Sequence, residues 1–133
     1  MLTDARDTTE IAQGARYLGL PVKANTTIYQ GGIVALDATG MAVPGSKSAG
    51  LTAAGRAEET VQNTGADGDA TIRVKRGVFV YGNSAANPVT TEHLLKECYL
   101  EDDCTVCSSA DGSSVAGKVI RIGPDGIAVE IGW

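Results

Sequence analysis

Three cysteines lie within ten residues near the end of the chain, in the segment CYLEDDCTVC of residues 98–107. Together with His93, Cys98, Cys104 and Cys107 would supply the four ligands of a structural zinc site. However, these ligands do not form two separated pairs, and the C-x-x-C spacer holds two β-branched residues where a zinc knuckle needs a tight turn. A thioredoxin-type redox pair would require a helix start in a βαβ unit, a context that this sequence does not offer.

The same segment predicts a β-hairpin around Asp102 and Asp103. A two-residue turn there places Cys98 opposite Cys107 on one face and Cys104 on the other face. We expect these cysteines to act as small hydrophobic residues of the hairpin. A disulfide between Cys98 and Cys107 is the alternative under oxidising conditions, because directly opposed cysteines lie near bridging distance.

Other candidates for chemistry are few. His93, the single histidine, lies in TTEHLLKE, which predicts a short surface helix with Thr90 or Thr91 as its N-cap. Asp67 and Asp69 share a glycine-rich loop, but the further acidic ligands of a calcium loop do not follow. With no nucleophile elbow, P-loop or dinucleotide motif, we expect no catalytic residues, no metal site, no cofactor and hence no enzyme.

Composition favours a small β-rich domain. The 133 residues suit one domain, and 43% hydrophobic but only 5% aromatic residues predict a core of Val, Ile, Leu and Ala. A formal charge of −5 argues against direct contact with nucleic acid, which needs clustered Lys and Arg. No apolar run approaches the roughly 20 residues of a membrane span, and the N-terminal residues lack the features of a signal peptide. In a reducing cytoplasm the cysteines would remain thiols.

Short β-prone runs separated by turns recur from Thr26 onward. In TIRVKRGVFVY the apolar residues alternate with Arg73 and Lys75, until Arg76 and Gly77 indicate a bulge or bend. A turn at Pro124-Asp125 predicts a C-terminal hairpin. The pattern predicts an all-β fold, a small jelly-roll-like sandwich or barrel of about eight to ten short strands with one short helix.

We expect residues 1–25 to form an extended N-terminal arm and residues 26–133 a single β domain. Apolar residues in the arm are predicted to dock on a neighbouring surface, although a disordered terminus is the alternative. The charged strand face is either solvated or meets an acidic partner. The predicted partner-binding residues are therefore Tyr17, Leu18, Leu20, Val22, Arg73, Lys75 and Arg76.

Several segments resemble the capsid cement, or head decoration, proteins of tailed bacteriophages and Mu-like prophages. They are ANTTIY, GIVALD, GDATIRV followed by RGVF, and VAGKV, and the resemblance covers most of residues 22–133. It implies a small β-rich protein that binds the outside of the coat-protein shell, clamps neighbouring subunits and forms dimers or trimers there. It brings no catalytic residues, and it does not include the cysteine hairpin.

We therefore expect a noncatalytic structural protein of a virion, made in the bacterial cytoplasm and bound to the outer surface of the capsid. Its expected partners are the major capsid protein and further copies of itself, as a homodimer or homotrimer, without nucleic acid or membrane. Deleting residues 1–22 should leave the β domain folded but weaken shell binding. The alternative is a head-fibre, tail or adhesion β module that binds a host-surface ligand.

Overall fold

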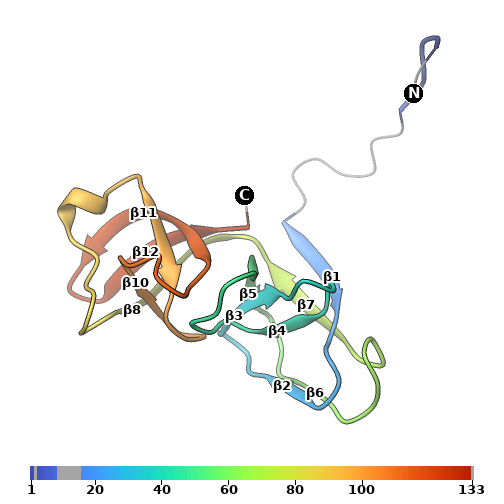
Figure 1. The fold of residues 1–133 in the computed structure, drawn as a ribbon, viewed down its shortest axis with the longest axis horizontal. Helices are drawn as coiled ribbons and strands as arrows, with labels where there is room; N and C mark the ends of the chain where they lie inside the picture. The colour runs from blue at the N-terminus through green and yellow to red at the C-terminus, as the bar shows by residue number, and fades with distance from the viewer. Residues whose placement is uncertain (2, 9–15, 133) are drawn as a thin grey trace.

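The computed structural model describes residue 1, residues 3–8 and residues 16–132 (Figure 1). These residues form twelve strands and one short 3-10 helix, which confirms the predicted all-β fold. None of their helical segments has the length and apolarity needed to cross a membrane. The elements are β1 (Tyr17–Pro21), β2 (Thr26–Ile28), β3 (Ile33–Leu36), β4 (Ala42–Pro44), β5 (Thr52–Ala57), β6 (Val61–Asn63), β7 (Thr71–Lys75), β8 (Gly77–Asn83), η1 (Thr91–His93), β9 (Glu97–Leu100), β10 (Thr105–Cys107), β11 (Val115–Gly123) and β12 (Gly126–Ile131).

The strands divide into an N-terminal sheet and a C-terminal barrel (Figure 1). The sheet has the order β1-β7-β5-β3-β4, and β2 pairs with β6 beside it. The closed barrel has the order β10-β8-β12-β11-β9. The alternating segment TIRVKRGVFVY passes from one part to the other, since β7 ends at Lys75 and β8 begins at Gly77. The predicted bend at Arg76 and Gly77 is thus the junction between sheet and barrel.

Strand β3 is buried on both faces and joins the two cores. Ile33 and Ala35 belong to the core of the barrel, whereas Val34, between them, belongs to the core under the N-terminal sheet. All three side chains are fully buried. A strand covered on both faces reads as a continuous apolar run, which explains the sequence IVAL without any alternation.

Gly55 allows β5 and β7 to cross closely. A Cβ at this position would overlap the carbonyl oxygen of Lys75, and the φ of Gly55 is +153°. Both conditions favour glycine, which has no side chain to collide and tolerates positive φ. The small residues of AGRA in β5 therefore reflect close strand packing.

The predicted N-terminal arm does not include residues 17–21, because they form β1, an integral strand of the sheet. It pairs antiparallel with β7, from Tyr17 opposite Lys75 to Pro21 opposite Thr71. Val22, which follows, is fully buried in the core under the sheet. Residues 17–22, which were expected to belong to the arm, are therefore part of the β fold. Met1 and residues 3–8 are exposed, and the rest of the predicted arm before residue 16 lies outside the described residues.

Loop side chains hold the chain after β1 in place. The buried amide of Asn63 donates to the carbonyl oxygens of Val22 and Lys23, at 2.9 and 3.2 Å. Asp67 Oδ1 accepts a hydrogen bond from the backbone N–H of Ala24 at 2.7 Å. The glycine-rich loop thus anchors residues 22–24, which explains why the arm does not extend to residue 25.

The cysteine hairpin forms with a register one residue away from the prediction. β9 and β10 pair so that Cys107 lies opposite Tyr99 instead of Cys98. The loop between the strands has four residues, and the Asp102 carboxylate accepts a hydrogen bond from the backbone N–H of Cys104 at 2.8 Å. Because side chains alternate along a strand, this shift of one residue places Cys98 and Cys107 on opposite faces of the hairpin, whereas the predicted register placed them on the same face.

The predicted helix is reduced to the single turn η1. The backbone N–H of Thr90 donates to His93 Nδ1 at 2.9 Å, so that His93 caps the turn. The chain leaves the helical conformation at Leu94, and Leu95 has a φ of +62°.

Candidate functional site

The outer face of β1 and β7 brings together three of the predicted partner-binding residues. Tyr17 lies directly opposite Lys75, and Gly19 lies opposite Arg73. Directly opposed residues of an antiparallel pair point to the same face of the sheet. We call these four residues, Tyr17, Gly19, Arg73 and Lys75, the cationic face.

An aromatic ring lies beside both cations of this face. The centroid of the Tyr17 ring is 5.6 Å from the guanidinium carbon of Arg73 and 5.5 Å from Lys75 Nζ. These distances suit cation–π attraction, worth roughly 0.5–1 kcal/mol per pair at an exposed site. Tyr17 nevertheless remains 54% exposed, so that its ring is available to a partner. The arrangement presents a ring and two positive charges to solvent together.

Acidic residues lie on the side of the cationic face that is farther from β1. Arg56 of β5 is opposite Lys75 and extends the row of cations, but its guanidinium bonds both carboxylate oxygens of Glu58, at 3.0 and 3.1 Å. The carboxylate of Glu59 accepts a hydrogen bond from the backbone N–H of Arg73 at 3.3 Å. The charge of Arg56 is therefore paired on the β5 side, whereas no carboxylate among the described residues forms an ion pair with Arg73 or Lys75.

Sequence reasoning did not identify Arg56 as part of this region. The segment AGRAEE lacks a regular alternation, because the pairing of β5 with β3 contains a register shift. Arg56 also stacks on Phe79, with its guanidinium carbon 4.4 Å from the ring centroid. The sequence signal for Arg56 was a basic residue in a weakly apolar strand. The residues that surround Arg56 in space come from distant strands, so that this signal did not connect it with the cationic face.

The other predicted partner-binding residues lie elsewhere. Leu18 and Leu20 alternate to the opposite face of β1 and pack partly buried against the core under the sheet. Val22 is fully buried there, so that it offers no surface to a partner and its prediction as a binding residue is corrected. Arg76, at the junction with β8, packs its aliphatic stem against the backbone of Gly132. The backbone N–H of Arg76 donates to the carbonyl oxygen of Arg16 at 2.7 Å.

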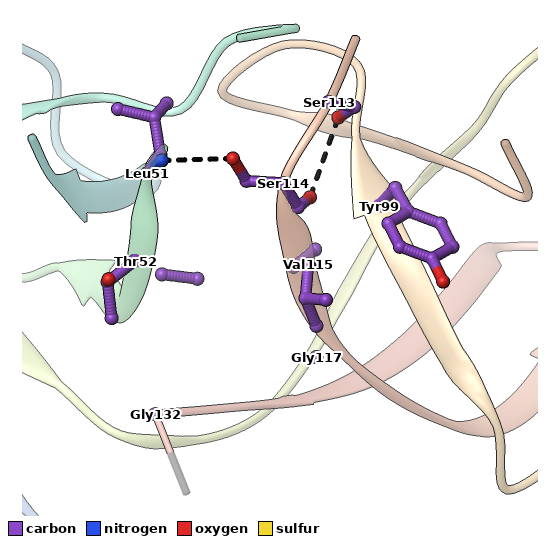
Figure 2. Close-up of a pocket in the computed structure, with 10 residues that line it drawn as sticks. Leu51, Thr52, Tyr99, Ser113, Ser114, Val115, Gly117 and Gly132 are labelled. Atoms are coloured by element: carbon purple, nitrogen blue, oxygen red, sulfur yellow. Dashed lines mark hydrogen bonds between the residues drawn. The ribbon is translucent and has the colours of Figure 1, made fainter. Parts of the chain in front are cut away.

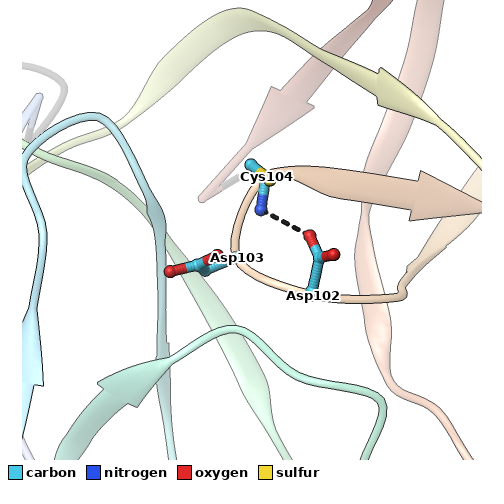
Figure 3. A group of neighbouring side chains, drawn as sticks. All are labelled: Asp102, Asp103 and Cys104. Atoms are coloured by element: carbon cyan, nitrogen blue, oxygen red, sulfur yellow. Dashed lines mark hydrogen bonds between the residues drawn. The ribbon is translucent and has the colours of Figure 1, made fainter.

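Asp102, Asp103 and Cys104 form a compact acidic cluster in the hairpin loop (Figure 3). One ligand atom from each lies within 4.8 Å of the others. The hydrogen bond with Thr105 lowers the pKa of the Cys104 thiol, but the Asp102 hydrogen bond, burial and the negative charges of both aspartates outweigh it and raise that pKa. Three ligands with a protonated thiol fall short of the four that structural zinc prefers. The carboxylate of Asp102 instead stabilises the turn, because it accepts the hydrogen bond from the backbone N–H of Cys104.

The remaining polar candidates also have local partners. His93 accepts from the Thr90 backbone through Nδ1 and lies beside Glu92, with 3.8 Å between His93 Nε2 and the carboxylate. Asp67 anchors Ala24, and Asp69 accepts from the N–H of Ala66 at 2.9 Å. These hydrogen bonds explain the residues as parts of turns.

A groove of about 480 Å³ lies between the sheet and the barrel, and it was not apparent from the sequence (Figure 2). Its walls come from β5, β9 and the start of β11, with Gly132 at one end. Ser114 spans the walls: its Oγ accepts from the N–H of Leu51 at 3.0 Å and donates to the carbonyl of Ser48 at 2.6 Å. Among the described residues that line the groove there is no carboxylate, imidazole or amine. The groove therefore provides a concave surface and hydroxyl groups for binding.

In comparisons with protein-family models, with curated proteins and with solved structures, no match to this chain was found.

Proposed function

We propose that this chain is a noncatalytic structural protein of a virion, which binds the outer surface of the capsid shell and stabilises contacts between major capsid protein subunits. The cationic face carries the proposal. It combines an exposed ring and two cations at the edge of a sheet, in a protein whose formal charge is −5. A local charge opposite in sign to the whole molecule orients a protein on an acidic surface.

The resemblance of residues 22–133 to head decoration proteins supports the same function. A capsid offers many copies of one surface, so weak contacts made by a dimer or trimer add up to firm retention. In this proposal the protein is made in the bacterial cytoplasm and resides on the outside of the shell. Its partners are the coat protein and further copies of the same chain.

The test is a binding titration with empty, expanded shells assembled from the major capsid protein of the same virus. Purified protein should co-sediment with the shells to saturation, and the decorated shells should withstand a higher temperature than bare shells before they release coat protein. Absence of saturable binding would reject the proposal and direct attention to the head-fibre, tail or adhesion function, for which a glycan-binding screen is the next experiment.

A further inference from the structure

The backbone of β1 presents free hydrogen-bonding groups at the edge of the sheet. The N–H of Val22 donates to Ala70, and the N–H of Arg76 donates to Arg16, at 2.9 and 2.7 Å. Hydrogen-bonded pairs alternate along an antiparallel ladder, so the even-numbered residues of β1 bond to β7. The N–H and C=O groups of Tyr17 and Gly19 therefore point outward. Within the described part of the chain, no strand pairs with this outer edge over those two residues.

The open edge is short. Pro21 has no N–H to donate to a further strand. Immediately after it, Val22 forms a parallel bridge with Ala42, and the N–H of Lys23 donates to the carbonyl of Ala42 at 3.1 Å. A strand added to β1 can consequently pair only with Tyr17 and Gly19, through about four backbone hydrogen bonds. So few bonds give little affinity, and side chains must supply the rest.

Gly19 leaves a path from this edge to Arg73. It lies between the open edge and Arg73 on the same face, and a Cβ at Gly19 would meet only Thr71 Cγ2, at 3.7 Å. A strand added to β1 would lie two strand spacings from β7, about 9.6 Å. An arginine and a glutamate side chain together can span that distance across a glycine. A larger residue at position 19 would stand between them.

We infer that the partner of the cationic face is an extended acidic segment of the coat protein, which adds to β1 as a sixth strand of the sheet. Its backbone pairs with Tyr17 and Gly19, and a carboxylate opposite Gly19 reaches Arg73 while a second approaches Lys75. Charge complementarity selects this occupant, because Arg73 and Lys75 lie on the strand next to β1 and no described carboxylate forms an ion pair with either. The inference rests on the proposed function, which supplies the coat protein as partner.

The test is hydrogen–deuterium exchange on the protein bound to empty expanded shells, read residue by residue after release. The Tyr17 and Gly19 amides should exchange quickly in the free protein and at least tenfold more slowly on the shell. The Leu18 and Leu20 amides, which already bond to β7, should change much less. Gly19→Thr should reduce shell affinity at least tenfold, because it fills the path to Arg73 with a residue that suits a strand.

Thermal unfolding of Gly19→Thr is measured in parallel, to separate a loss of affinity from a loss of the fold. The unfolding temperature of this variant should match that of the wild type within a few degrees. Gly19→Ala, which adds only the Cβ, is the matched variant and should bind more tightly than Gly19→Thr. Two results would overturn the inference and leave the proposed function standing. In the first, the wild type binds the shell but the amide exchange of Tyr17 and Gly19 does not slow. In the second, Gly19→Thr binds the shell as tightly as the wild type. Failure of the wild type to bind would overturn both.

Discussion

Tyr17 shows how far single residues could be interpreted from the sequence. Tyr17, Arg73 and Lys75 were each expected to bind a partner, but nothing in their spacing places residue 17 opposite residue 75. That contact depends on the pairing of strands more than fifty positions apart, which local periodicity does not encode. The three residue types were predictable, whereas the surface that they form together was not.

The three thiols should differ sharply in reactivity. Cys98 and Cys107 are buried and Cys104 is exposed, and all three are free. Burial also raises the pKa of Cys98 to about 12, which suppresses the reactive thiolate. We expect iodoacetamide at pH 8 to add one group to the native protein, on Cys104, and three groups in denaturant.

Intact-mass measurement counts the added groups, and a Cys104→Ser variant serves as the control that should add none in the native state. Two or more additions to the native wild type would contradict the buried positions of Cys98 and Cys107. A mass two units lower with only one reactive thiol in denaturant would indicate the disulfide that the sequence left open.

Asp37 should make stability depend on pH in acid. The hydrogen bond from the Thr39 hydroxyl, followed by that from the Met41 N–H, lowers the pKa of Asp37 from 3.8 to about 2. Because the folded pKa is depressed, the stabilisation is complete above about pH 4 and is lost as the pH falls through about 2. Asp37→Asn, which cannot ionise, should lose less free energy of unfolding than the wild type between pH 5 and pH 2.

Urea unfolding at several pH values gives this comparison directly, and other carboxylates cancel because both proteins contain them. Identical pH profiles for the two proteins would show that the turn between β3 and β4 does not depend on the charge of Asp37.

At the scale of elements, strand existence was easier to predict than strand limits. The alternation of β7 and the turn at Pro124-Asp125 gave correct strands, because each has a clear local signal. β8 also forms, but Val78 and Val80, expected on the buried face, are 51% and 45% exposed, because the bend at Arg76 and Gly77 reverses the faces of the strand. β1 was missed since Gly19 and Pro21 interrupt an alternation that only Leu18, Leu20 and Val22 carry. The hairpin register was missed because a four-residue loop with an Asp102 turn replaced the expected two-residue turn.

Truncations should separate the N-terminal residues from β1. Removing residues 1–8, whose described side chains are exposed, should leave the free energy of unfolding unchanged within about 0.5 kcal/mol. Removing residues 1–22 deletes β1 and the buried Val22, a side chain whose burial alone is worth roughly 1.5–3 kcal/mol. We expect this longer truncation to be destabilised by at least about 2 kcal/mol or to fail to fold, contrary to the expectation from the sequence.

Denaturant unfolding followed by circular dichroism measures both truncations. Equal stability of the two would mean that β1 contributes nothing to the fold, and the description of the cationic face would then fail with it.

The whole molecule is held together by residues shared between sheet and barrel. β3 contributes to both cores, and the buried Tyr81 of β8 donates its hydroxyl to the carbonyl of Gly31 at 3.1 Å. Ser114 adds a second link across the groove. These contacts join positions far apart in sequence, so the fold class could be predicted from composition and turns while the division into sheet and barrel could not.

The most direct measurement is the affinity of the wild type for empty expanded shells against that of Arg73→Gln/Lys75→Gln. The control is Lys47→Gln/Lys118→Gln, which removes the same charge from exposed residues outside the cationic face. We predict saturable wild-type binding that weakens with salt, a loss of at least tenfold in the Arg73 and Lys75 variant, and a change of less than threefold in the control. Equal affinity of the two variants, or no wild-type binding, would contradict the account.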